Sequence, residues 1–169
     1  MSLPVVIFSH GQESGPWGTK IRSMAENVRA LGYEADSVDY QGISDSKERV
    51  DKLIDVCKKI DGPVVLIGSS MGGYVATAAA SHVRAAGLFV LAPAYYMPGL
   101  ENLTPTAPDI PICIVHGWRD DIVPVENSIR FAKDCAATLH VIDGDHRLTN
   151  KLDEINYLLT RFIDGLSKN

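Results

Sequence analysis

The feature that most constrains the fold of this chain is the run of small residues at 68–73, which reads Gly-Ser-Ser-Met-Gly-Gly. It follows an apolar run at 63–67 and precedes a run of small residues at 76–80. The order is therefore strand, G-x-S-x-G and helix, which is the context that a nucleophile elbow requires. Such an elbow places Ser70 at the apex of a sharp turn, and glycines on both sides leave room for neighbouring backbone.

The adjacent Ser69 offers a second register for the same motif. The glycine spacing favours Ser70, because Gly68 and Gly72 lie two residues before and two residues after it. A short Gly/Ser run is by itself also a common turn, so the prediction of an elbow depends on the strand before it and the helix after it.

Two later strands also end in polar residues. The apolar run 110–115 leads into His-Gly-Trp-Arg-Asp-Asp-Ile-Val-Pro at 116–124. The run 138–142 leads into Asp-Gly-Asp-His at 143–146. An acid and a histidine thus follow two successive strands downstream of the serine.

Together these motifs resemble the α/β-hydrolase superfamily, in which a serine, an acid and a histidine follow their strands in that order. The matching segments are 9–11 (Ser-His-Gly), 68–73, 116–124 and 144–146, so the resemblance covers nearly the whole chain. The chain is most similar to the small, nearly lidless serine hydrolases, which include acyl-thioesterases and acyl-glucuronide esterases.

The resemblance implies a catalytic triad of Ser70, Asp120 and His146. In the implied acyl transfer, His146 takes the proton of Ser70 as the serine attacks a carbonyl carbon, and Asp120 orients the imidazole. Asp121 is the rival acid, and only the family register favours Asp120 over it.

The resemblance also implies an oxyanion hole made by two backbone N–H groups. One belongs to Met71, directly after the serine, and the other to Gln12, in the loop after the first strand. The side chain of Gln12 is a less favoured third donor.

The other histidines are interpreted as structural or peripheral. His10 and His116 stand in His-Gly pairs at strand ends, where hydrogen bonds to loop backbone are expected. His82 follows the elbow helix, and His140 lies inside a strand from which it does not easily reach the carboxyl edge of the sheet.

The remaining pattern alternates strands and helices. A capping box at Asp45 and Glu48 and a glycine at position 32 mark helix ends. Strands are expected at 5–8, 33–39 (more polar, hence an edge), 63–67, 86–92, 110–115 and 138–142; helices are expected at 19–31, 45–60, after the elbow, and at 126–136 and 151–166. Helical connections make the strands parallel. We therefore expect an α/β fold, a three-layer α/β/α sandwich with strand order 2-1-3-4-5-6, as in a reduced α/β-hydrolase fold.

The composition fits one domain over residues 1–169, with 46% hydrophobic and 22% charged residues. A net charge of −5 argues against a nucleic-acid partner. No apolar run approaches the roughly 20 residues of a membrane span, and the first strand begins so early that no signal peptide is expected. Three cysteines without C-x-x-C spacing predict core packing, a cytoplasmic location, and neither metal nor cofactor.

One long irregular segment, 93–109, carries four prolines and leaves the carboxyl end of a strand. It stands where larger hydrolases insert a lid, and we expect it to be a short cover loop. Its apolar residues are expected either to wall an acyl pocket or to pack the loop onto the body of the protein; they are Tyr95, Tyr96, Met97 and Leu100.

Trp17 and Trp118, on other strand-end loops, extend this tentative substrate pocket into an aromatic rim around Ser70. Arg119 and Arg147 flank the expected acid and base. They either bind an anionic group of the substrate or belong to the solvated surface.

The sequence therefore predicts a serine esterase or thioesterase for a small acyl substrate. The alternative is a non-catalytic ligand-binding protein on the same scaffold, since a fold does not determine a function. Nucleotide binding is not indicated, because 68–73 matches neither glycine-rich phosphate motif. The oligomeric state leaves no sequence signal.

Overall fold

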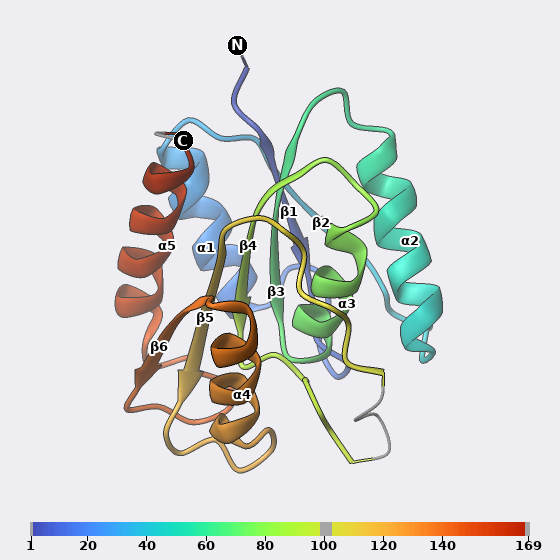
Figure 1. Ribbon diagram of the computed structural model, residues 1–169. Helices are drawn as coiled ribbons and strands as arrows, with labels where there is room; N and C mark the ends of the chain where they lie inside the picture. The colour runs from blue at the N-terminus through green and yellow to red at the C-terminus, as the bar shows by residue number, and fades with distance from the viewer. Residues whose placement is uncertain (1, 99–102, 168–169) are drawn as a thin grey trace.

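The computed structural model describes residues 2–98 and 103–167, in which six parallel strands form one sheet between two layers of helices (Figure 1). The strand order is β2-β1-β3-β4-β5-β6, as predicted, and every neighbouring pair is parallel. The strands are β1 (Val5–Ser9), β2 (Ala35–Val38), β3 (Val64–Ser69), β4 (Ala85–Leu91), β5 (Ile112–Gly117) and β6 (Thr138–Ile142). This confirms the predicted reduced α/β-hydrolase sandwich.

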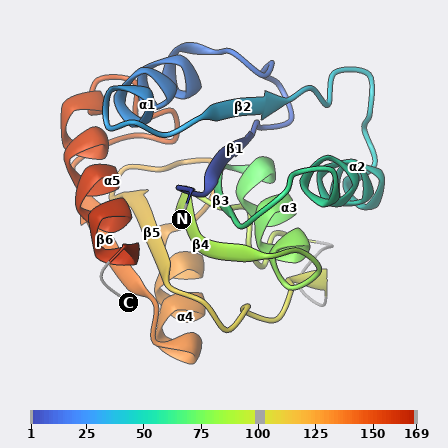
Figure 2. The same ribbon diagram turned by 90° about the horizontal axis from the view of Figure 1, so that it is seen from above.

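Five helices cover the two faces of the sheet. Helices α1 and α5 lie on one face, and α2, α3 and α4 lie on the other (Figure 2). Their bounds are α1 (Thr19–Ala30), α2 (Ser46–Lys58), α3 (Met71–Ala80), α4 (Val125–Cys135) and α5 (Leu152–Leu166). Because all strands run the same way, their carboxyl ends meet at one edge of the sheet, the lower edge in Figure 1.

Each face of the sheet carries its own apolar core. Every residue of β3 and β5 is buried, because both faces of these central strands are covered by helices. The edge strand β2 buries only Val38, in agreement with its more polar sequence. Two of the three free cysteines, Cys57 and Cys113, are buried in the two cores. The expectation of one domain over residues 1–169 stays a prediction.

Local signals in the sequence determine two helix ends. Gly32, with a φ of +96°, follows the last turn of α1, where its amide donates to the carbonyl of Arg29. At the start of α2, the carboxylate of Asp45 accepts a hydrogen bond of 3.0 Å from the amide of Glu48. The reciprocal bond of a capping box, from the Asp45 amide to the Glu48 carboxylate, does not occur in the described chain, so only half of the predicted box forms.

Two boundaries differ from the sequence prediction in a way that matters for the site. Strand β5 begins at Ile112 and continues through Gly117, so that His116 lies within the strand and is fully buried.

No helix among residues 2–98 and 103–167 has the length and apolar character needed to cross a membrane.

Candidate active site

Ser70 lies on a tight turn between β3 and α3, with φ 55° and ψ −120°. A residue with a side chain rarely adopts this conformation, so the backbone here is strained. The strain is held in place by backbone contacts. A Cβ at Gly68 would overlap the carbonyl of Gly72, and a Cβ at Gly72 would overlap the carbonyl of Ser9. Ser69, the rival residue, is the buried last residue of β3.

The three residues predicted as a triad lie in one hydrogen-bonded series. The Oγ of Ser70 is 3.1 Å from Nε2 of His146, and Nδ1 of His146 is 2.8 Å from Oδ2 of Asp120. A carboxylate can only accept, so the imidazole proton is on Nδ1. Nε2 therefore presents a lone pair to the Ser70 hydroxyl, which is the arrangement of a general base.

Asp120 is fully buried and accepts four hydrogen bonds. Its Oδ1 accepts from the amides of Ile122 (2.9 Å) and Val123 (2.8 Å), and its Oδ2 accepts from His146 and from Nε2 of His116 (3.0 Å). Burial alone would raise the pKa of Asp120, but these hydrogen bonds outweigh it and hold the pKa below its usual range. The carboxylate is therefore ionised wherever the protein is folded at ordinary pH.

The neighbouring Asp121 is exposed and accepts no hydrogen bond from the described residues. Its carboxylate does not take part in the series that Asp120 forms with His146. The geometry therefore agrees with the family register for the acid.

His116 contacts loop backbone and also the acid of the series, a second contact that the sequence did not indicate. As expected, it bonds loop backbone, with Nε2 2.9 Å from the carbonyl of Val123. Its Nδ1 is 2.7 Å from Oγ of Ser128 on α4. Because Nε2 faces two acceptors, it carries the proton and also donates to Asp120. Sequence reasoning missed this second histidine on the acid; its only signal is the four-residue spacing from Asp120.

The loops that carry the acid and the histidine are joined through their backbones. A Cβ at Gly117 would overlap the carbonyl of Gly144. The amide of Trp118 donates to Ile142 (2.9 Å), and the amide of Arg119 donates to Gly144 (3.0 Å). These backbone contacts hold the loops of Asp120 and His146 side by side.

The residues predicted to supply the oxyanion donors, Gln12 and Met71, belong to segments close to the serine. Gly11, just before Gln12, lies so close that a Cβ on it would be 3.7 Å from Cβ of Ser70. Met71 begins α3 directly after the serine. Neither amide donates a hydrogen bond to a residue of the described chain. The role of these two amides as oxyanion donors stays a prediction.

The structure buries Tyr95 in the core, which favours the packing alternative for this residue over a place in a pocket wall. Its side chain is fully buried, its ring stacks on Phe131 at 4.0 Å, and its hydroxyl lies 2.6 Å from Oγ1 of Thr77. The alternative expectation, that the cover loop packs on the body of the protein, holds for this residue. The ring of Tyr95 occupies a space in the core beside Phe131 and Thr77.

The other predicted pocket residues show contacts mainly with the body of the protein. Tyr96 packs against the guanidinium of Arg130 at 3.9 Å, and Met97 is partly buried against the same apolar core as α2, α3 and α4. Trp17 packs on the α1 side, with Arg29 over its ring at 5.3 Å. Their role in a pocket stays a prediction, and Leu100 lies outside the described residues.

Several of the remaining residues that the sequence analysis named are exposed on the surface. Trp118 is 61% exposed on the acid loop and stays a candidate for the rim. Arg119 forms an ion pair with Asp143, so its charge is already matched within the protein. Arg147 is exposed, and His82 is exposed just after α3.

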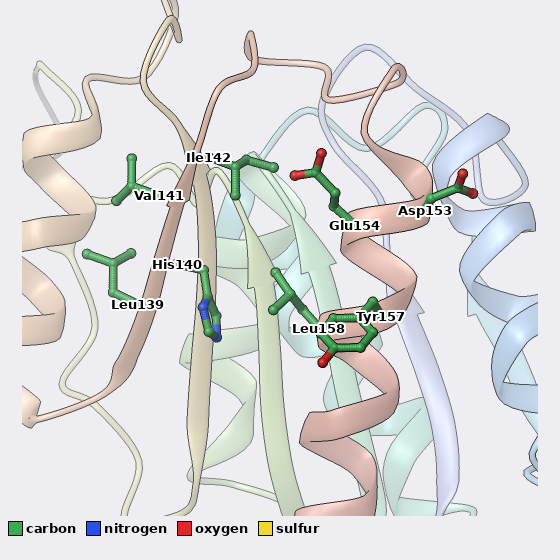
Figure 3. A pocket seen from close by; sticks show the side chains of 8 residues that line it. All are labelled: Leu139, His140, Val141, Ile142, Asp153, Glu154, Tyr157 and Leu158. Carbon is green, nitrogen blue, oxygen red and sulfur yellow. The ribbon is translucent and has the colours of Figure 1, made fainter.

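A groove of about 610 Å³ lies elsewhere, between the edge strand β6 and helix α5 (Figure 3). His140 is among its lining residues, in keeping with its expected distance from the carboxyl edge. None of Ser70, Asp120 and His146 lines this groove.

Comparisons with known proteins agree with this fold. The human palmitoyl-protein thioesterase ABHD10, a mitochondrial protein, is 28% identical over 227 residues, covering 97% of this chain and 74% of its own length. That alignment is longer than the 169 residues of this chain, so the relative carries insertions. A Xanthomonas campestris protein assigned to the α/β hydrolase superfamily has a TM-score of 0.86 and 29% identity, covering 99% of this chain and all of that one.

Est1E from Butyrivibrio proteoclasticus has a TM-score of 0.77 and 21% identity, covering 95% of this chain and 88% of that one, and shows the fold alone. Since the human relative is mitochondrial, the cytoplasmic location stays a prediction. The model of the alpha/beta hydrolase family matches residues 6–156. This match covers most of the chain and agrees with the strand order and with the strained serine. The chain therefore belongs to the α/β hydrolase family.

Proposed function

We propose that the protein is a serine hydrolase that cleaves a small carboxylic ester or thioester through an acyl-enzyme on Ser70. The observation that carries the proposal is the series from Ser70 through His146 to the buried carboxylate of Asp120. A strained serine with a correctly protonated base beside it is the arrangement that nucleophilic acyl transfer needs.

In the first half of the reaction, Oγ of Ser70 attacks the substrate carbonyl while Nε2 of His146 takes its proton. The negative charge that develops on the carbonyl oxygen faces the amides of Gln12 and Met71. Each such donor contributes about 3–4 kcal/mol to transition-state stabilisation. The protonated His146 then gives its proton to the leaving alcohol or thiol, and the acyl group remains on Ser70.

In the second half, His146 takes a proton from water, and the water oxygen attacks the acyl carbon. The intermediate collapses to release the carboxylic acid and restores the Ser70 hydroxyl. In both halves the ionised Asp120 stabilises the imidazolium, which its lowered pKa supports.

The relatives named as palmitoyl-protein thioesterases support an acyl substrate. The short cover loop of this chain favours an open site with modest selectivity for chain length. Ester and thioester are both consistent with the proposal, because the two differ only in the leaving atom that His146 protonates.

The experiment that tests the proposal is labelling with a fluorophosphonate, read by intact and peptide mass. We expect a single adduct on Ser70 that disappears in Ser70→Ala and His146→Ala, while Ser69→Ala still reacts. Ser70→Ala should also lose hydrolysis of p-nitrophenyl acetate while its circular dichroism spectrum stays unchanged.

Retained turnover in a folded Ser70→Ala variant would refute the proposal. A folded wild-type protein that gives no adduct would instead favour the non-catalytic ligand-binding protein on this scaffold.

A further inference from the structure

Arg49, in the first turns of α2, is a charged residue that the proposed mechanism does not use. Its side chain is only 3% exposed. Its Nε donates to the carbonyl of Ile43 (2.7 Å), its Nη1 donates to the carbonyl of Gly11 (3.3 Å), and the guanidinium lies 5.3 Å from the ring centre of Tyr40. All three partners are uncharged.

The charge of Arg49 is not neutralised by an acid. No carboxylate of residues 2–98 or 103–167 lies within 4.0 Å of it. The acid in this cluster is Asp39, which is 54% exposed and lies 3.9 Å from Nε2 of His10. A buried cation without an acidic partner is unfavourable for stability.

His10 acts on the same carbonyl as Arg49. The amide of Tyr40 donates to Nε2 of His10 (2.8 Å), and an amide nitrogen can only donate, so the imidazole proton is on Nδ1. That Nδ1–H donates to the carbonyl of Gly11 at 2.7 Å. Burial lowers the pKa of His10, and the neutral ring fits this pattern. Ser14 adds a third, weaker donor at 3.4 Å.

The Gly11 carbonyl belongs to the same peptide unit as the Gln12 amide. In a planar trans peptide, the C=O and the N–H point in opposite directions. Donors gathered on the Gly11 oxygen therefore hold the Gln12 N–H pointing in the opposite direction, away from Arg49 and His10. The close approach of Gly11 to Ser70 places this peptide at the edge of the reacting atoms.

We propose that Arg49 is a positioning residue that clamps the Gly11–Gln12 peptide from behind and strengthens the Gln12 amide as an oxyanion donor. This inference rests on the proposed function, because it assigns a purpose to an amide that faces the substrate only if Ser70 is the nucleophile.

The charge of Arg49 matters as well as its geometry. A cation on the carbonyl side draws electron density toward the Gly11 oxygen, which makes the N–H of the same peptide more positive. The effect grows as negative charge develops on the substrate oxygen. Arg49 thus favours the transition state over the bound substrate, without touching either one.

The test compares Arg49→Met, which removes the charge at similar length, with Arg49→Lys. The lysine keeps the charge but replaces the planar guanidinium, which donates from two nitrogens, by a single ammonium group. Arg161→Met is the matched control, because its guanidinium also lies over an aromatic ring, that of Tyr157, on the helix α5 that covers the other face of the sheet. The substrates are p-nitrophenyl acetate and its thiono analogue, whose sulfur accepts oxyanion hydrogen bonds poorly.

For the oxygen ester we expect kcat to fall about 10- to 100-fold in Arg49→Met with little change in KM, less in Arg49→Lys, and not at all in Arg161→Met. The wild-type preference for the oxygen ester over the thiono ester should shrink in Arg49→Met by a similar factor. Loosening of the fold would lower both rates equally and leave that preference unchanged, and this result would overturn the inference.

Wild-type turnover in folded Arg49→Met would also overturn it and leave the proposed function intact. A wild-type protein without turnover or label on Ser70 would overturn both. If Arg49→Met does not fold, Arg49→Gln, which can still donate to Ile43, takes its place with the same expected outcomes.

Discussion

Replacing Asp120 with asparagine is a sharp test, because the surroundings decide which way the new amide points. Oδ1 of Asp120 faces two backbone N–H donors, from Ile122 and Val123. The amide oxygen of Asn must occupy that place, since an NH₂ there would face two donors. The NH₂ group is therefore forced to the Oδ2 position, where His116 and His146 now donate.

This orientation reverses the protonation of His146. The new NH₂ donates to Nδ1, so the imidazole proton moves to Nε2 and faces the Ser70 hydroxyl. His146 can no longer take the serine proton. The corresponding change in serine proteases lowers kcat about 10⁴-fold, which is about 5 kcal/mol of transition-state free energy. We expect a loss of the same size in Asp120→Asn.

The folded state should be weakened as well. His116 must turn its proton to Nδ1, which leaves its Nε2 lone pair 2.9 Å from the carbonyl of Val123. The Nε2 lone pair and the carbonyl oxygen of Val123 are then two buried acceptors that face each other without a proton between them. This reduces the free energy of unfolding by about 1–3 kcal/mol.

The assay is kcat and kcat/KM for p-nitrophenyl acetate together with urea unfolding. The matched control is Asp121→Asn, one residue away and exposed, which should retain wild-type rate and stability. A loss of less than about tenfold in Asp120→Asn, or an equal loss in Asp121→Asn, would refute the reasoning.

Three further predictions concern stability. Gly72→Ala should lower the free energy of unfolding by more than about 3 kcal/mol in urea titrations, because the new methyl group overlaps a backbone carbonyl of β1, whereas Gly165→Ala, with open space around it in α5, should raise it by about 0.5–1 kcal/mol. Tyr95→Phe should lower it by about 1–2 kcal/mol through the lost buried hydrogen bond and leave kcat unchanged, whereas a large fall in kcat would return this residue to the substrate pocket. The lowered pKa of Asp120 adds stability that is fully present above its unfolded value near 3.8 and is lost as the pH falls toward its folded value. Unfolding measured between neutral pH and about pH 3 should therefore show a smaller loss in Asp120→Asn than in the wild type.

Much of the fold could be predicted because it depends on repeated local patterns. Central strands such as β3 are apolar throughout, and the helices show one apolar face, so the sequence predicts both element type and layer order. The candidate site could be predicted where its residues follow strand ends in a fixed order, as Ser70 and His146 do.

Residues whose role depends on a distant partner escaped this reasoning. Arg49 lies beside the apolar face of α2 and has the pattern of a surface charge; its partner Gly11 is 38 positions away. Tyr95 lies in a proline-rich segment for which the sequence left open a pocket wall or packing onto the body, and the contact of its ring with Phe131 decides for the core. Neither contact leaves a periodic or local signal.

The interlocked backbones of Gly117 and Gly144 have a consequence for how this protein can diversify. Contacts between main-chain atoms hold the acid loop and the base loop next to each other. The exposed side chains on these loops are therefore not needed for this arrangement. Under the proposed function, exchanges at exposed positions such as Trp118 and Arg147 are expected to alter which acyl groups enter while proton transfer stays intact. New substrate ranges are then reachable by single replacements, without an inactive intermediate along the way.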